Sequence, residues 1–175
     1  MHLCDERAHR TMTGVQPGLY IVGTPIGNLG DLSARAAETL RAAALIVAED
    51  TRVTSRLLDR YAIRAPMIAA HKFSEAARAD AIIARARQEP VALVTDSGMP
   101  SVADPGARLV AAARRAGVRV TVVPGPSAVT AALALSGYGA DRFVFGGFLP
   151  SHGEARRRAL CELLAEKGAS VVVGD

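Results

Sequence analysis

The sequence Val91-Ala92-Leu93-Val94-Thr95-Asp96-Ser97-Gly98-Met99-Pro100 joins an apolar run directly to a turn that carries a carboxylate. An almost wholly apolar run of this length is typical of a strand buried on both faces of a parallel sheet. A carboxylate seldom ends such a strand without a partner. A second turn follows at residues 104–106 (Asp-Pro-Gly), and long ordered loops are more often functional than not. We therefore expect a strand at 91–95 and a functional loop after it, with turn chemistry alone as the alternative.

Three other segments repeat this pattern of an apolar run followed by a turn-rich loop. They are residues 22–31 (VGTPIGNLGD), 48–52 (AEDTR) and 123–128 (VPGPSA). Loops that leave the carboxyl ends of parallel strands meet at one edge of the sheet, and ligands bind there. Four such loops, rich in Gly, Pro and small hydroxyl residues, predict a pocket for a small cofactor that is lined largely by backbone.

Apolar runs alternate with helical patterns through most of the chain, which predicts an α/β fold with a mainly parallel five-stranded sheet flanked by helices. The predicted strands are 18–22, 45–48, 66–70, 91–95 and 119–123, and the predicted helices are 32–44, 53–61, 74–88, 106–116 and 127–137. After Asp141 an aromatic segment, a basic helix at 154–167 and a strand at 170–173 follow. Because so few elements cannot bury a core of their own, we expect a disordered tail at 1–17, a cofactor-binding α/β domain at 18–141 and the incomplete start of a second α/β domain at 142–175.

Composition narrows the class of protein. Half of the 175 residues are hydrophobic, but no apolar stretch approaches the roughly 20 residues of a membrane span, so we expect no membrane partner. Cys4 and Cys161 have no Cys or His neighbour at ligand spacing, which predicts neither a disulfide framework nor a metal site and indicates a reducing, cytoplasmic location. The formal charge of +4 favours polyanionic partners. Solvation of helix faces explains many of the arginines equally well.

The polar residues of the loops leave several roles open. The glycines at 23, 27 and 30 form neither a dinucleotide fingerprint nor a P-loop, and Pro25 removes a donor that a phosphate would need, so a phosphate-bearing cofactor is disfavoured. Glu49 and Asp50 end a predicted strand where an acid could meet a ribose, although Asp50 could equally cap the next helix. Arg52 could pair with these acids or contact a phosphate. The Ser127 hydroxyl could cap a helix, which is the default, or contact a ligand.

Taken together, the loops resemble those of the tetrapyrrole methylase superfamily, which uses S-adenosylmethionine. The match runs from about Gly18 to about Lys167, and its segments are 24–31, 48–52, 95–100 with 104–106, 124–128 and 147–150 (Gly-Phe-Leu-Pro). The resemblance implies that the cofactor lies between two α/β domains and that the full-length protein is a homodimer. It implies cofactor contacts at Pro25, Ser97, Gly98, Met99, Val102, Ser127 and Ala128.

Within the superfamily, residues 49–52 and 71–75 (His-Lys-Phe-Ser-Glu) are similar to the branch that modifies RNA. That resemblance implies 2′-O-methylation of a cytidine ribose in small-subunit ribosomal RNA. It also implies RNA contacts at Arg52, Lys72, Arg156 and Arg157. A ribose hydroxyl is a poor nucleophile, so we expect a catalytic carboxylate, with Asp96, Glu49 and Asp50 as the candidates.

Three alternatives stay open. A methylase of a tetrapyrrole intermediate or of diphthine belongs to the same superfamily, and a nicotinamide-dependent oxidoreductase is disfavoured by the absent fingerprint. The family continues through a complete second domain, with an acidic-Ser-Pro-His-Arg-like segment just after the strand where this sequence ends at Asp175. An inactive cofactor-binding fragment is therefore the third alternative.

Overall fold

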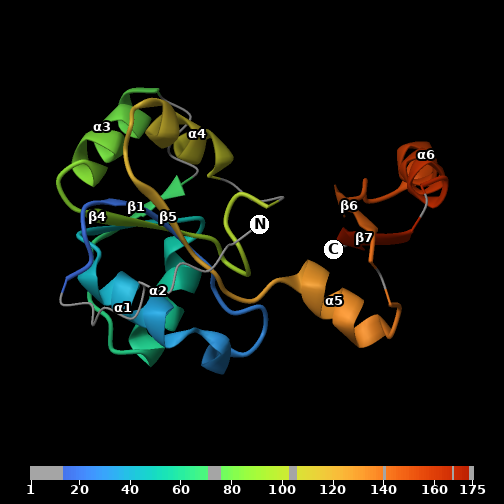
Figure 1. The fold of residues 1–175 in the computed structure, drawn as a ribbon, viewed down its shortest axis with the longest axis horizontal. Coiled ribbons are helices and arrows are strands. Elements are labelled where there is room, and N and C mark those ends of the chain that lie inside the picture. Colours follow the sequence, from blue (N-terminus) through green and yellow to red (C-terminus); the bar gives the residue numbers. More distant parts are fainter. Residues whose placement is uncertain (1–13, 71–75, 103–105, 140, 167, 174–175) are drawn as a thin grey trace.

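The computed structural model describes residues 14–70, 76–102, 106–139, 141–166 and 168–173. Its centre is a parallel five-stranded sheet in the order β3-β2-β4-β1-β5 (Figure 1). The strands are β1 (Gly18–Val22), β2 (Leu45–Ala48), β3 (Met67–Ala69), β4 (Pro90–Val94) and β5 (Val120–Val123). All five predicted strands are thus confirmed, and the carboxyl ends of β2, β4, β1 and β5 lie next to one another along one edge.

Helices cover both faces of the sheet. They are α1 (Ala34–Ala42), α2 (Thr51–Arg60), α3 (Ala76–Ala86) and α4 (Ala107–Arg115), and a single 3-10 turn, η2 (Leu29–Asp31), precedes α1. In Figure 1, α1 and α2 lie on one face and α3 and α4 on the other. Ser33 caps α1 by accepting a hydrogen bond from the Ala36 amide at 3.1 Å. The N-cap of α2 is Asp50.

The core has two halves, one on each face of the sheet. The β2 side chains show how the pleat divides them, since Ile46 packs with Leu40 of α1 and Leu57 of α2, whereas Val47 packs on the other face with Ile82 of α3. Every residue of β1 and β2 is buried. Burial on both faces is the reason why these strands are continuous apolar runs, with no alternation of polar residues.

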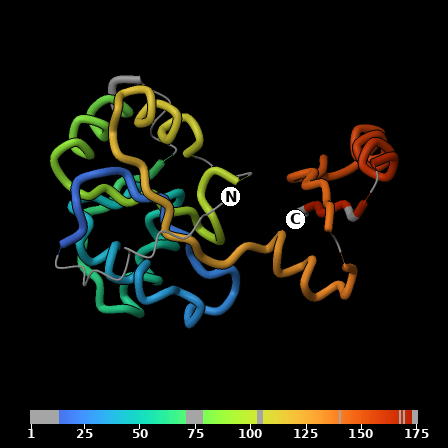
Figure 2. The backbone as a smooth tube through the Cα atoms, viewed as in Figure 1, coloured from blue at the N-terminus to red at the C-terminus, as the bar shows by residue number. Residues whose placement is uncertain are grey.

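The chain leaves the sheet at β5 and passes through α5 (Ala128–Ser136) to a second, smaller group of elements (Figure 2). This group holds β6 (Phe143–Phe148), α6 (Gly153–Leu164) and β7 (Ala169–Val173), and β6 pairs in parallel with β7. Among the described residues, no helix is long and apolar enough to cross a membrane. The predicted domain boundaries after residues 17 and 141 stay predictions. Residues 1–13 of the predicted tail lie outside the described residues. Val15, also in the predicted tail, packs against the half of the core that includes α1.

Candidate functional site

The first and third loops are joined by backbone hydrogen bonds. The Thr24 amide donates to the Gly98 carbonyl at 2.9 Å, and the Gly98 amide donates to the Thr24 carbonyl at 3.2 Å. The buried Thr24 hydroxyl also donates to the Thr95 carbonyl at 3.0 Å. Gly98 has φ +86°, a conformation that only glycine adopts without strain. The turn after β4 therefore needs a glycine at this position to form the bridge to Thr24.

The first and fourth loops touch through two glycines. A Cβ built on Gly23 would lie 2.7 Å from the Gly125 Cα, and one built on Gly125 would lie 2.8 Å from the Gly23 carbonyl carbon. Both distances are far below van der Waals contact, so neither position has room for a side chain. The Gly23 amide also donates to the Val123 carbonyl at 3.0 Å. Three of the four predicted loops thus form one connected edge.

A cleft of about 280 Å³ opens at this edge. Six of the seven residues expected to contact a cofactor line it: Ser97, Gly98, Met99, Val102, Ser127 and Ala128. The seventh, Pro25, is not part of the lining, and its neighbour Ile26 is. The remaining lining residues are Glu49, Thr95, Asp96, Val129, Phe145 and Phe148. The cleft lies where the four loops were expected to converge.

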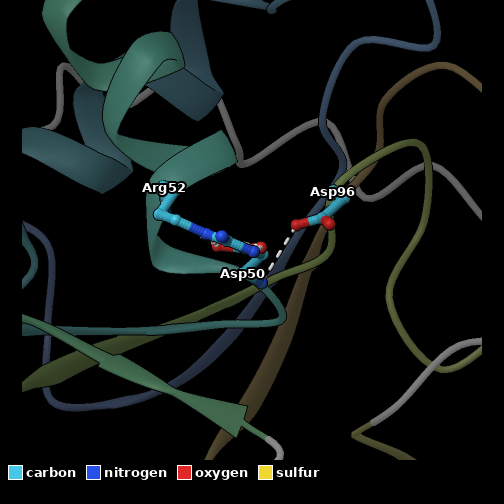
Figure 3. A network of polar contacts seen from close by, with 3 residues as sticks. All are labelled: Asp50, Arg52 and Asp96. Carbon is cyan, nitrogen blue, oxygen red and sulfur yellow. Dashed lines mark hydrogen bonds and ion pairs between the residues drawn. The ribbon is translucent and has the colours of Figure 1, made fainter.

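Glu49 and Asp96 connect the ends of β2 and β4 through their side chains. Glu49 Oε2 accepts hydrogen bonds from the Thr95 hydroxyl at 2.5 Å and from the Asp96 amide at 3.2 Å. In return, Asp96 Oδ1 accepts a hydrogen bond from the Asp50 amide at 3.0 Å (Figure 3). These contacts hold the ends of β2 and β4 together where the cleft begins, and both carboxylates lie in its wall.

Asp50 has a different environment and does not line the cleft. Its Oδ1 accepts the Arg52 amide at 2.8 Å, which caps α2, and both of its oxygens accept hydrogen bonds from the Arg52 guanidinium. The guanidinium lowers the pKa of Asp50 to about 2. Arg52 is 86% exposed and pairs with Asp50 in Figure 3. Asp50 is therefore both the cap of α2 and the ion-pair partner of Arg52. A role of Asp50 in catalysis and a phosphate contact by Arg52 stay predictions.

The pKa of the Asp96 carboxyl group is raised above its ordinary value. Burial is the largest cause, because it penalises the charged form, and the negative charges of Glu49 and Asp50 act in the same direction. The Asp50 amide and the Arg52 guanidinium oppose the shift without cancelling it. A carboxyl group with a raised pKa in a cleft is a candidate for proton transfer.

The remaining site predictions concern Ser127 and three basic residues. Ser127 occupies the N-cap position of α5, but its side chain makes no capping hydrogen bond, so the default expectation of a cap is wrong. Arg156 and Arg157 lie on α6, where Arg156 donates to the Pro150 carbonyl at 3.1 Å and Arg157 approaches Glu154 at 4.0 Å. Lys72 lies outside the described residues. No group of three or more His, Cys, Asp or Glu side chains in the described part of the chain could hold a metal ion.

Sequence reasoning missed part of the apolar wall of the cleft. Phe145 and Phe148 reach it from β6, about 50 residues after Asp96 in the chain. The cluster of phenylalanines around residues 143–148 was a signal of a packed surface, but nothing local showed what that surface faces. Ile26 and Val129 each follow a residue that was expected in the cleft or beside it, and turn geometry decides which of the neighbours points inward.

Comparisons with known proteins agree on the family. The family model of tetrapyrrole (corrin/porphyrin) methylases matches residues 18–175. Ribosomal RNA small subunit methyltransferase I of Xylella fastidiosa (strain Temecula1) is 53% identical over 152 residues, which are 86% of this chain and 56% of that protein. The protein of the same name from Escherichia coli O157:H7 is 44% identical over 161 residues, or 91% of this chain and 56% of that protein.

This chain therefore spans just over half the length of these two relatives. Among solved structures, a diphthine synthase superposes with a TM-score of 0.71 at 20% identity, over 90% of this chain and 64% of that one. At this identity the likeness supports the fold alone, and it agrees with the parallel five-stranded sheet seen here. From the family match, the two relatives and the fold, the chain belongs to the tetrapyrrole methylase family.

Proposed function

We propose that this chain binds S-adenosylmethionine in the cleft and forms the cofactor-binding part of a methyltransferase. We further propose that the acceptor is the 2′-oxygen of a cytidine ribose in small-subunit ribosomal RNA, in the cytoplasm. Relatives named ribosomal RNA small subunit methyltransferase I support the RNA substrate. The superfamily resemblance supports the cofactor and the ribose position.

The observation that carries the proposal is the charge of the cleft. Its lining includes the carboxyl groups of Glu49 and Asp96, but no Lys or Arg of the described residues. Such a lining suits a cationic sulfonium and repels phosphates. The apolar ring of Phe145 and the small residues of the third and fourth loops fit the rest of a nucleoside-sized molecule. When bound, this cofactor supplies a methyl group on a positively charged sulfur.

The chain's own contribution is chiefly positioning. Correct orientation of two reactants can lower the reaction barrier by about 7–11 kcal/mol. A general base typically raises the rate by about 10²–10⁴-fold, which corresponds to about 3–5 kcal/mol. The Thr24–Gly98 bridge and the Gly23–Gly125 contact hold the loops of this edge together, which favours the larger of these two effects, orientation. Asp96 is the proposed base: Oδ1 is held by the Asp50 amide, which leaves Oδ2 to accept the proton of the ribose hydroxyl.

Titration calorimetry with S-adenosylmethionine tests the cofactor, with NAD⁺ and ATP as phosphate-bearing controls. We expect heat of binding only with S-adenosylmethionine. Binding of NAD⁺ at the cleft would refute the proposal and revive the oxidoreductase alternative. For the reaction, methyl transfer is measured to small-subunit ribosomal RNA, to a porphyrinoid and to diphthine. Transfer to either of the latter two, and none to RNA, would favour the other branches of the superfamily.

A homodimer is the proposed assembly. None of the residues of α5 is buried, and the helix has the apolar sequence AVTAALALS without a charge. Leu135 is 90% exposed, and Tyr138, just beyond the helix, is 76% exposed. A contiguous apolar surface of this kind marks a contact site. Sedimentation velocity should show a dimer that dissociates on Leu135→Glu; a monomeric parent chain would contradict the proposal.

A further inference from the structure

Three arginines form a row along the exposed face of α2. Arg52, Arg56 and Arg60 are four residues apart and all exposed, whereas Thr54, Leu57 and Leu58 of the same helix are buried. Residues four apart lie on one face of a helix, one turn above the other. At 1.5 Å per residue, the row extends over about 12 Å. We call these three residues the α2 arginine row.

The positive charge of this row is only partly neutralised. Asp59, the one acid within α2, makes an ion pair with Arg64 at 2.7 Å, outside the row. Asp50 pairs with Arg52. Within the described part of the chain, Arg56 and Arg60 have neither an ion pair nor a side-chain hydrogen bond. By contrast, Arg85 of α3 pairs with Glu89 four residues later, which is the usual way in which a helix face is solvated.

The row starts beside the cleft, one hydrogen-bonded neighbour away from its wall. Arg52 lies in the first turn of α2, two residues after Asp50, whose amide is bound by the cleft residue Asp96 (Figure 3). From there α2 runs back along its face of the sheet, so Arg56 and Arg60 lie successively farther from the cleft. The α2 arginine row therefore forms a path that leads away from the proposed reaction site.

We propose that the α2 arginine row binds the sugar–phosphate backbone of the single-stranded RNA that flanks the modified nucleotide. This inference rests on the proposed function, because it presumes RNA as the substrate. Proteins that recognise RNA in a sequence-specific way mostly bind single-stranded loops and ends, so the strand beside the modified nucleotide needs a surface to follow. Phosphate contacts fix the register of a nucleic acid without reading its sequence, and Arg is the side chain best matched to phosphate. The row supplies such contacts at regular intervals.

The test compares two double variants of the 175-residue chain. Arg56→Ala/Arg60→Ala removes two charges from α2, and Arg114→Ala/Arg115→Ala removes two exposed charges from α4 on the opposite face of the sheet. The probe is a fluorescein-labelled single-stranded oligoribonucleotide of mixed sequence, and its anisotropy is titrated across a range of KCl concentrations. Thermal melting and calorimetry with S-adenosylmethionine show whether each variant keeps its fold and its cofactor binding.

Each phosphate contact to a single strand contributes about 0.7 to the slope of log affinity against log salt. Loss of two contacts should therefore reduce the magnitude of the slope by about 1.4. If the variant and the parent bind equally at 1 M salt, the variant should bind roughly 25-fold more weakly than the parent at 0.1 M salt. We expect this loss in the α2 variant only, with melting and cofactor binding unchanged. Equal losses in both variants, no loss in either, or no RNA binding by the parent chain would overturn the inference. Failure of the parent chain to bind S-adenosylmethionine would instead refute the proposed function.

Discussion

Replacing Gly23 by alanine should destabilise the fold by wedging the first and fourth loops apart. The new Cβ would lie 2.7 Å from the Gly125 Cα and amide nitrogen, so the backbones must separate by roughly 0.7 Å or more to reach ordinary contact. Over-packing of this kind typically costs about 1–3 kcal/mol. For a chain of this size, each kcal/mol lowers the melting temperature by about 2–4 °C, which predicts a fall of about 2–12 °C.

Thermal melting by circular dichroism measures this effect, with Gly139→Ala as the matched control. A Cβ on Gly139 would meet nothing within 4 Å, so this control should stay within about 0.5 kcal/mol of the parent. Gly125→Ala places a Cβ in the same contact from the fourth loop. The double variant with Gly23→Ala should lose less stability than the sum of the losses in the two single variants. If Gly23→Ala melts at the same temperature as the Gly139→Ala control, the loops do not approach each other as closely as described.

Three further predictions concern polar side chains at the cleft and at the starts of two helices. Burial above all raises the pKa of Asp96, so ionisation of Asp96 weakens the fold as the pH rises from the ordinary pKa of an Asp to the higher pKa of the folded state. Above that pH interval, Asp96→Asn should melt at a higher temperature than the parent, and below it the increase in melting temperature should be smaller. The same variant should lose methyl transfer. Glu49→Gln keeps an oxygen for both of its donors but removes the charge that helps to raise the pKa of Asp96, so a carboxyl NMR titration should find that pKa lower than in the parent. Ser33→Ala removes a helix cap and should lower the free energy of unfolding, measured with denaturant, by about 0.5–2 kcal/mol. Ser127→Ala removes no capping hydrogen bond, so it should change the affinity for the cofactor with little change in stability.

The sheet could be predicted because burial on both faces leaves a direct trace in the sequence. A strand such as β2 (Leu45–Ala48) contacts helices on either side, so each of its four residues is apolar and the run ends where the chain meets solvent at Glu49. The helix beginnings were less certain. Asp and Ser are both common N-cap residues, so residue type does not separate Asp31 from Ser33 as the cap of α1; Ser33 is the cap, and Asp31 belongs to the 3-10 turn before it.

The cleft could be predicted only as far as its local turns reach. Ser97 to Val102 were expected in it because they leave the end of a buried strand, and this local argument needs no other part of the chain. Phe145 and Phe148 could not be placed, since their position depends on where α5 directs the chain. Residue type and position likewise pointed to a Ser127 cap, but the Ser127 side chain makes no capping hydrogen bond.

The three candidate carboxylates could not be ranked from the sequence, because adjacent acids look alike until their hydrogen bonds are known. Asp50 is saturated, with its oxygens shared between a helix cap and a guanidinium, and its pKa of about 2 makes it a poor proton acceptor. Glu49 uses one oxygen to hold both Thr95 and Asp96, which gives it a positioning role. Asp96 lies in the cleft, has a raised pKa and keeps one carboxylate oxygen without a partner among the described residues. Its neighbours thus fix the base in place and, through their charge, make it a stronger proton acceptor, so the proposed chemistry depends on all three acids although only one takes the proton.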